Sequence, residues 1–241
     1  RQSFTLFDEK LFFDLEKNLN SLANELKAVF FLTEIKSSIN TVILVSKFDH
    51  CLNDLLFRVR NNSLSLNVKA IISNHKTAQE IASFYEIPFY HLPIDKLNKL
   101  EQETKIKNII NKNDVELIVL ARYMQILSEE FTDQFQGRLI NIHHSFLPSF
   151  KGSKPYHQAF ERGVKVIGAT AHYVTKDLDE GPIIEQDTQE VDHEMMPNDL
   201  VSMGQDIESR VLYRALKAHS ESRVFLNGKR TVVFKGHRKL K

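Results

Sequence analysis

The feature that most constrains the fold is a series of short, largely apolar segments separated by segments with helical periodicity. The segments are TVILV (41–45), NVKAIIS (67–73), FYHL (89–92), ELIVLA (116–121) and RLINIHH (138–144). Strands that are apolar on both faces belong to parallel sheets covered by helices on two sides. We therefore expect an α/β fold with an open, mostly parallel twisted sheet and helices on both faces.

The C-terminal half of the chain has a different pattern. VIGATAHYVT (166–175) and GPIIEQDTQEV (181–191) alternate between apolar and polar residues, which predicts longer strands that run antiparallel to their neighbours. A helix is predicted over 198–221, with Asn198 as its N-cap, and two short strands follow around the turn NGK (227–229). A capping box in TAQE, with Thr77 as cap and Glu80 as its partner, predicts the start of another helix.

The N-terminal segment reads as a separate small unit. SFTLF (3–7) and KLFFDLE (10–16) are predicted strands, and NLNSLANELKAVFFLTE (18–34) has apolar residues at helical spacing. Two strands and one helix bury too little apolar surface to fold alone. We therefore divide the chain into a small N-terminal segment with its linker, 1–38, and a main domain, 39–241.

Composition excludes several classes of partner. The net charge of +1 gives no reason to expect nucleic acid or a membrane surface. No apolar run approaches the ~20 residues that a membrane-spanning helix needs. Cys51 is the single cysteine, so no internal disulfide can form, and we expect a cytoplasmic protein.

Polar residues follow the apolar core of the segment RLINIHH. Ligands of open parallel sheets lie beyond the carboxyl ends of the strands. In an extended strand Asn141 and His143 share one face, and His144 points to the other. An amide and an imidazole on one face can hold a carbonyl oxygen as it becomes an oxyanion, which predicts a catalytic centre.

An acidic turn supplies a possible partner for these groups. YVTKDLDEGP (173–182) carries Asp177, Asp179 and Glu180 at the end of a predicted strand, and Gly181 with the proline after it forces a turn. A carboxylate beside an imidazole can orient it, raise its basicity or hold a water molecule. His172 lies just upstream and can add a further contact.

Two other interpretations of the polar strand end stay open on spacing alone. The side chains can simply be solvated, as acidic turns usually are. A metal site needs three converging ligands, but the two histidines are adjacent, no cysteine is near and no H-E-x-x-H motif occurs. We therefore expect no metal.

A family resemblance narrows these alternatives. NIHHSFLPSFKGSKPYHQAFERGVKVIGATAHYVTKDLDEGPIIEQ (141–186) resembles the formyltransferase fold of folate enzymes, whose core pattern is Asn-x-His followed by Leu-Asp-x-Gly-Pro. The resemblance covers 41–234 and implies a formyltransferase-type sheet. It also places the family's catalytic trio on Asn141, His143 and Asp179.

The resemblance implies a folate pocket as well. ARYMQIL (121–127) is similar to the segment that lines the pocket and reads the pterin through main-chain groups, and Arg122 can meet the carboxylate tail of the folate. The substrate-binding residues expected in this way are Arg122, Tyr123, Met124, Gln125, Ile126, Leu127, His172, Asp177, Glu180 and Gly181. The substrate is a small folate, with no separate cofactor.

Within the family, VSKFDHCLNDLL (45–56), IISNH (71–75) and IPFYHLP (87–93) are most similar to the deformylases, which hydrolyse 10-formyltetrahydrofolate. Deformylases carry an N-terminal ACT domain, and the segment 1–38 resembles only the later part of it. This resemblance implies one-carbon metabolism and purine biosynthesis as the setting, and a homo-oligomer.

The segment after the first strand bears on the choice between hydrolase and transferase. A transferase acting on glycinamide ribonucleotide has a glycine-rich turn there that binds phosphate. SKFDHCLND (46–54) has no glycine, and Asp49 would repel a phosphate, so water is the expected acceptor. His50, Asn74 and His75 can line a second pocket, or the last two can merely form a turn.

Two further functions remain as alternatives. One is a formyltransferase that moves the formyl group from 10-formyltetrahydrofolate to an amine. The other is a non-catalytic module that binds folate or senses an amino acid, which the presence of Asn141, His143 and Asp179 together argues against.

Overall fold

The computed structural model describes residues 9–28, 30, 32, 37–95, 97–148 and 155–236. The chain divides into two compact units, Arg1–Lys36 and Ser37–Lys241. None of the helices within the described residues is both long and apolar enough to cross a bilayer.

The first unit contains a helix where a strand was expected. Helix α1 spans Glu9–Leu26, so the predicted strand KLFFDLE (10–16) is wrong. Apolar residues at 11, 12, 15, 19, 22 and 26 recur every three to four positions, which is a helical repeat rather than the two-residue repeat of a strand. The predicted strand at 3–7 lies outside the described residues, and the ACT-like character of this segment stays a prediction.

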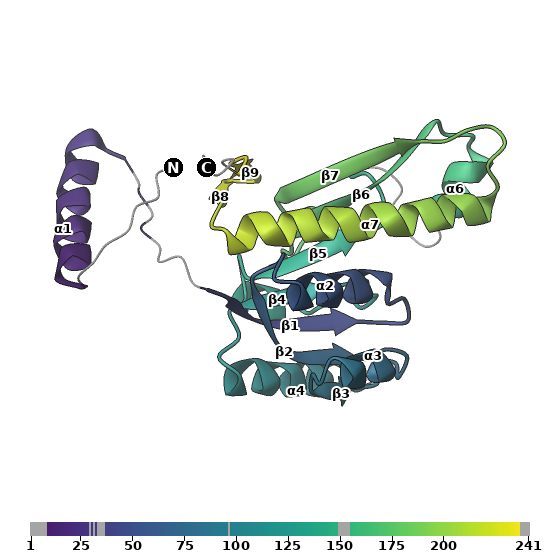
Figure 1. Ribbon diagram of the computed structural model, residues 1–241, viewed down its shortest axis with the longest axis horizontal. Coiled ribbons are helices and arrows are strands. Elements are labelled where there is room, and N and C mark those ends of the chain that lie inside the picture. Colours follow the sequence, from purple (N-terminus) through teal and green to yellow (C-terminus); the bar gives the residue numbers. More distant parts are fainter. Residues whose placement is uncertain are drawn as a thin grey trace. The chain divides into compact units, whose positions relative to one another are not determined.

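The second unit is built on a seven-stranded sheet in the order β3-β2-β1-β4-β5-β6-β7 (Figure 1). Its strands are β1 (Ile39–Val45), β2 (Leu66–Ser73), β3 (Phe89–His91), β4 (Leu117–Leu120), β5 (Leu139–His143), β6 (Val166–Tyr173) and β7 (Ile183–Glu190). Strands β1 to β5 pair in parallel, and β6 and β7 pair antiparallel. The expected mostly parallel sheet with two antiparallel strands is confirmed.

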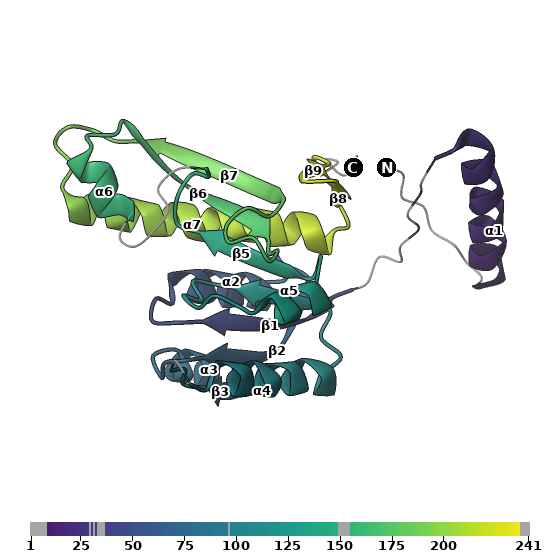
Figure 2. The same cartoon turned by 180° about the vertical axis from the view of Figure 1, so that it is seen from behind.

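Helices cover both faces of this sheet. They are α2 (His50–Arg60), α3 (Gln79–Phe84), α4 (Lys99–Lys112), α5 (Glu129–Gln134), α6 (Pro155–Glu161) and α7 (Pro197–Ser220). Helix α7 runs along one face, beside α2 (Figure 1), whereas α4 and α5 lie on the other (Figure 2).

Strand β1 shows why the apolar runs are continuous. Ile43 and Val45 face the core layer that contains α2 and α7, whereas Val42 and Leu44 face the layer with α4 and α5. All four side chains are fully buried, because alternate residues of a strand point to opposite faces and both faces are covered.

The smaller details of the prediction have mixed outcomes. The C-terminal hairpin of β8 (Val224–Asn227) and β9 (Arg230–Val233) is confirmed. The two predicted caps are wrong. Helix α3 begins at Gln79, and the Thr77 hydroxyl instead donates to the carbonyl oxygen of Ser46 at 3.4 Å. Helix α7 begins one residue before Asn198, at Pro197, which is favoured in the first helical turn.

The strand order reverses between β1 and β4. From β1 the chain continues to β2 and β3 on one side, and from β4 it continues to β5 on the other. The loops that leave β1 and β4 therefore diverge at the carboxyl end of the sheet. Such a switch point is where open α/β sheets bind their ligands.

Candidate active site

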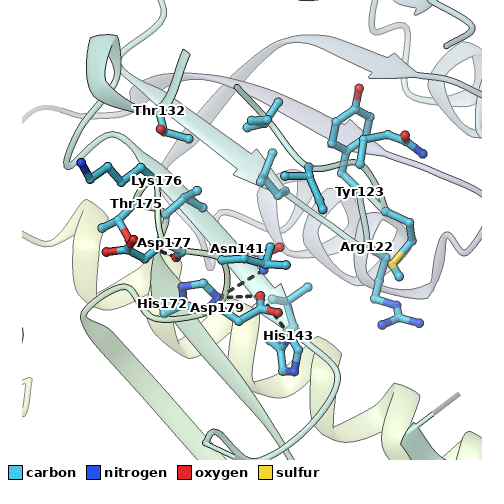
Figure 3. A pocket seen from close by; sticks show the side chains of 18 of the residues that line it. Arg122, Tyr123, Thr132, Asn141, His143, His172, Thr175, Lys176, Asp177 and Asp179 are labelled. Carbon is cyan, nitrogen blue, oxygen red and sulfur yellow. Dashed lines mark hydrogen bonds and ion pairs between the residues drawn. The ribbon is translucent and has the colours of Figure 1, made fainter. Parts of the chain in front are cut away.

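A pocket of about 230 Å³ lies at the carboxyl ends of β4 and β5 (Figure 3). One wall is the segment after β4, Arg122–Leu127, and the opposite wall is the loop after β6, Val174–Asp179. The end of β5 lies between them and contributes Asn141, His143 and His144. Segments distant in the sequence thus meet at the carboxyl ends of the strands.

His143 and Asp179 form the centre of this pocket. Nδ1 of His143 lies 3.2 Å from Oδ1 of Asp179, and the two side chains are 6% and 17% exposed. The other ring nitrogen of His143, Nε2, is buried and makes no hydrogen bond within the described residues. The carboxylate thus orients the imidazole, whose second nitrogen is left for another molecule.

His172 holds the third polar group, Asn141. Nδ1 of His172 donates to the carbonyl oxygen of Tyr173 at 2.8 Å, which leaves Nε2 as an acceptor in the neutral ring. Nδ2 of Asn141 lies 3.3 Å from that Nε2 and donates to it. Burial lowers the pKa of His172 and keeps the ring neutral. One amide hydrogen of Asn141 is thereby fixed and the other stays available.

The loop that carries Asp179 is constrained by its backbone. Asp179 has a φ of 57°, the left-handed region that aspartate tolerates better than most residues. A Cβ on Gly181 would lie 1.7 Å from the carbonyl oxygen of Tyr173, so only glycine fits there. The Tyr173 amide donates to the carbonyl oxygen of Pro182 at 2.9 Å and closes the loop.

The carboxyl group of Asp179 is ionised at neutral pH. Burial raises its pKa, but the hydrogen bond from His143 and the electrostatic attraction of that neighbouring ring outweigh burial. The pKa therefore lies below its ordinary value of 3.8. An ionised carboxylate at 17% exposure can accept hydrogen bonds from a water molecule in the pocket.

Ser46, directly after β1, clamps the wall that follows β4. Its amide donates to the carbonyl oxygen of Arg122 at 3.2 Å, and its hydroxyl oxygen accepts from the amide of Met124 at 3.0 Å. The same hydroxyl donates to Oδ1 of Asn74 at 2.8 Å. The β1 loop thus sets the shape of the wall without lining the pocket itself.

This pocket lies within the part of the chain that matches a known family. Residues 39–216 match the family model described as formyl transferase. The chain belongs to the formyl transferase family.

Individual relatives cover most of the chain. It is 50% identical to the formyltetrahydrofolate deformylase of Corynebacterium sp. (strain P-1) over 226 residues, 92% of this chain and 79% of that protein. The crystal structure of the formyltetrahydrofolate deformylase from Burkholderia mallei has a TM-score of 0.85 at 47% identity, over 92% of this chain and 79% of that one.

A different member of the formyl transferase family shares the fold at lower similarity. The structure of glycinamide ribonucleotide transformylase 1 from Symbiobacterium toebii has a TM-score of 0.77 at 28% identity, over 86% of this chain and 99% of that one. The family fold is thus used by relatives described as deformylases and by one described as a transformylase.

The structure brings together most, but not all, of the residues expected to bind substrate. Those that line the pocket are Asn141, His143, Asp179, Arg122, Tyr123, Met124, Gln125, Ile126, Leu127, His172 and Asp177. Glu180 and Gly181 do not line it, because they turn the chain back toward β7. Thr132, Lys176 and His144 also line the pocket, although the sequence analysis did not name them as substrate-binding residues. For Lys176 and His144, the sequence signal was their position in or next to the predicted catalytic segments.

Arg122 and the residues of the predicted second pocket have partners within the protein. The guanidinium of Arg122 pairs with the buried carboxylate of Glu208, and its contact with the tail of a folate stays a prediction. His50 also bonds Glu208, Asn74 bonds Ser46 and His75 is exposed. None of the three lines the pocket at the ends of β4 and β5, and the second pocket stays a prediction.

Proposed function

We infer that the chain hydrolyses 10-formyltetrahydrofolate to tetrahydrofolate and formate. The relatives described as formyltetrahydrofolate deformylases are 44–50% identical to it over 80–92% of its length. The observation that carries the chemistry is the 3.2 Å contact between the Asp179 carboxylate and the His143 imidazole in a pocket at the edge of the sheet.

Asp179 is the group proposed to hold and deprotonate the attacking water. Its carboxylate keeps free lone pairs beside the pocket, and its lowered pKa keeps it ionised. The water oxygen attacks the formyl carbon, and its proton passes to the carboxylate. The loop backbone fixes the carboxylate in place, so that little reorganisation is needed at the moment of attack.

Asn141 and His143 are proposed to stabilise the oxyanion. Asn141 offers its second amide hydrogen at the end of β5, and His143 offers Nε2, which donates when both ring nitrogens carry a proton. Donors placed in this way lower the barrier by roughly 3–4 kcal/mol each. His143 then passes a proton to N10 as the C–N bond breaks, so formate and tetrahydrofolate leave.

The alternative of formyl transfer to an amine is supported by the shared fold with the transformylase of Symbiobacterium toebii. The segment SKFDHCLND (46–54) speaks against a nucleotide acceptor. It has no glycine, and its helix, α2, begins next to the acidic side chain of Asp49.

The decisive experiment incubates the purified chain with 10-formyltetrahydrofolate and no amine. We expect stoichiometric release of formate and tetrahydrofolate, measured by a formate dehydrogenase assay and by absorbance. Turnover that depends on an added amine would instead support the transferase. Binding of the folate without formate release would support a non-catalytic module.

A further inference from the structure

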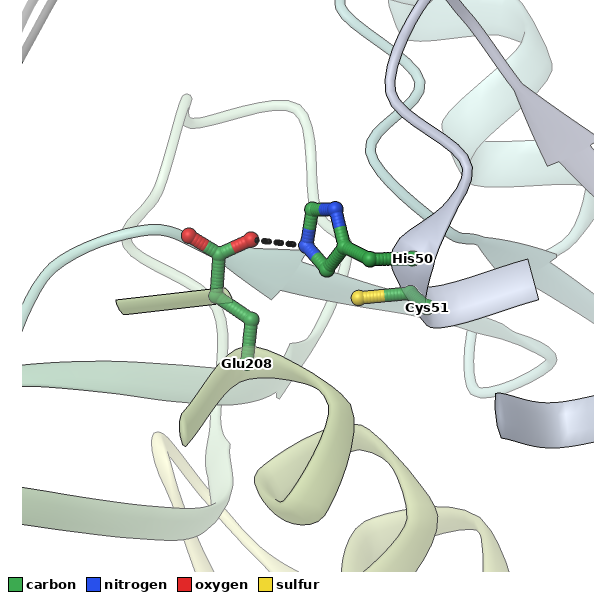
Figure 4. Close-up of side chains that lie close together, drawn as sticks. All are labelled: His50, Cys51 and Glu208. Carbon is green, nitrogen blue, oxygen red and sulfur yellow. Dashed lines mark hydrogen bonds and ion pairs between the residues drawn. The ribbon is translucent and has the colours of Figure 1, made fainter. Parts of the chain in front are cut away.

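A second group of polar side chains gathers around α7, and Figure 4 shows His50, Cys51 and Glu208 from it. At its centre is Glu208 of α7, whose side chain is 1% exposed. Oε2 of Glu208 lies 2.7 Å from Nε2 of His50, and Oε1 accepts from the hydroxyl of Tyr156 at 2.7 Å. Arg122 completes the group, with its Nε 3.3 Å from Oε2.

Stability alone does not account for this arrangement. The side chain of Arg122 is 11% exposed, and its Nε and Nη1 are buried without a hydrogen bond to any described residue. A buried ion pair recovers its desolvation cost only when its remaining donors are also satisfied. A well-packed apolar pair would be at least as stable, so the arginine needs another explanation.

A metal site is one such explanation, but the charges oppose it. His50, Cys51 and Glu208 offer three ligand atoms within 4.8 Å of one another. The guanidinium of Arg122 already lies against the same carboxylate and would repel a cation. Burial, followed by the charge of Glu208, raises the pKa of the Cys51 thiol, which therefore stays protonated and is a poor ligand.

The position of Arg122 in the fold suggests what it does. Arg122 follows β4, and His50 opens α2 after β1, so both lie at the switch point of the sheet. Arg122 also lines the pocket that contains His143 and Asp179. Its guanidinium lies 5.5 Å from the ring centre of Phe48, also in the β1 loop. Arg122 and its partners thus lie where an open sheet usually admits a ligand.

We propose that Arg122, held by Glu208, closes the acceptor side of the active site and thereby restricts the acceptor to water. This proposal rests on the proposed hydrolysis and names the residue that determines its specificity. An amine acceptor must bring its nitrogen to the formyl carbon beside His143, and any substituent on that nitrogen needs space next to the pocket. The side chain of Arg122 lines the pocket on that side, whereas a water molecule needs no such space.

Opening this side should allow the transfer reaction. The amine nitrogen would attack the formyl carbon, the bond from that carbon to N10 would break, and the amine proton would pass to N10. The products are an N-formyl amine and tetrahydrofolate. The groups that stabilise the oxyanion, Asn141 and His143, serve both reactions, so only the acceptor changes.

The backbone allows a clean test of Arg122. Its φ of 63° is in the left-handed region, where glycine is favoured over any residue with a Cβ. Arg122→Gly therefore removes the side chain without straining the chain. Combining it with Glu208→Gln avoids a buried unpaired carboxylate and keeps an oxygen that can accept from Tyr156. The matched control is Arg210→Gln with Asp187→Asn, an ion pair of 2.8 Å outside the pocket.

The experiment measures how the formyl group divides between water and an amine, with glycinamide and hydroxylamine as probes. We expect the ratio of N-formyl amine to formate to rise about tenfold or more in the double variant, the scale on which pocket size discriminates acceptors. The wild type and the control should give formate only. Mass spectrometry identifies the formylated amine, and thermal unfolding checks that each protein is folded.

Two results would overturn the proposal: a folded double variant that still cleaves the folate with an unchanged ratio, or a wild type that formylates the amine equally well. If the double variant does not fold, Arg122→Asn is used to measure the same ratio of N-formyl amine to formate. Asparagine also tolerates the left-handed backbone. A wild type that releases no formate without amine refutes the proposed hydrolysis instead, so the two failures can be told apart.

Discussion

Two carboxylates of this molecule lie next to a histidine at the same end of the sheet, yet their surroundings differ. Asp179 sits on a loop at the pocket, 17% exposed, with its closest contact to one ring nitrogen of His143. Glu208 sits inside a long helix, 1% exposed, and is bound by His50, Tyr156 and Arg122. The first carboxylate keeps lone pairs free, and the second has donors on both of its oxygens.

The difference shows that a carboxylate–histidine pair is not by itself a reaction centre. A carboxylate surrounded by donors cannot take a proton from water, because its lone pairs are occupied and its charge is compensated. Glu208 can therefore hold a structure in place, and Asp179 can act on a substrate. The variants below test this division, beginning with the largest expected effect.

Replacing Asp179 by Asn should remove nearly all turnover. The amide cannot accept the proton of the attacking water, and loss of a general base costs ~10²–10⁴-fold in kcat. Asparagine tolerates the left-handed φ of 57° at this position, so the loop should keep its shape. Formate release under saturating folate measures the effect.

The matched control for this variant is Asp192→Asn, which changes an exposed aspartate beyond β7 and should keep full activity. The free energy of unfolding of Asp179→Asn should stay within about 1 kcal/mol of the wild type, since the side-chain oxygen of asparagine can still accept a hydrogen bond from His143. A variant with wild-type kcat would show that Asp179 is not the base.

Replacing Glu208 by Ala should reduce the stability of the fold more than it reduces turnover. It leaves the guanidinium of Arg122 buried without a counter-charge, which costs about 3–5 kcal/mol of stability. The loss of kcat at a temperature where the variant is folded should be smaller than for Asp179→Asn. Urea unfolding and formate release on the same sample measure both effects, and equal stability of variant and wild type would contradict the assigned role.

Acid should also reduce the contribution of Glu208 to the stability of the fold. Burial raises the pKa of Glu208, but the hydrogen bond from His50 and the charge of Arg122 bring it below its ordinary value of 4.5. A group whose pKa is lower in the folded state stabilises the fold above its unfolded pKa. The contribution of Glu208 is therefore present above about pH 4.5 and is lost as the pH falls further.

The sheet and the reaction centre could be predicted because the signals for both are local. Continuous apolar runs indicated strands covered on two faces, and the two-residue repeat placed Asn141 and His143 on one side of β5. The turn at Gly181 indicated a chain reversal that could return Asp179 to the same edge. The resemblance to the formyltransferase fold then connected Asn141 and His143 with Asp179.

Other features depend on contacts that a single segment does not show. Glu208 lies in the middle of an amphipathic helix and looked like any other helix position, so the partner of Arg122 was not foreseen. The dense apolar residues of KLFFDLE suggest a strand over seven positions, whereas over a longer window they follow the helical repeat of α1. The predicted cap Thr77 bonds a carbonyl group 31 residues away instead.

A half-buried histidine, His219, sharpens the comparison, because no carboxylate of the described residues pairs with it. Its Nδ1 lies 2.8 Å from the hydroxyl of Tyr173, and burial lowers its pKa from 6.5 to about 4. The unfolded chain takes up a proton below its ordinary pKa while the folded chain does not, so folding loses stability as the pH falls. From about pH 7.5 to about pH 5 the loss should reach about 2 kcal/mol.

Replacing His219 by Gln should remove this part of the pH dependence, since glutamine can bond Tyr173 but does not titrate. Urea unfolding of variant and wild type at several pH values measures it, with the exposed residue His193 replaced by Gln as the control. Parallel curves for His219→Gln and the wild type would mean that the pKa of His219 is the same in the folded and the unfolded chain. The lack of a neighbouring carboxylate would then leave no trace in the stability of the fold.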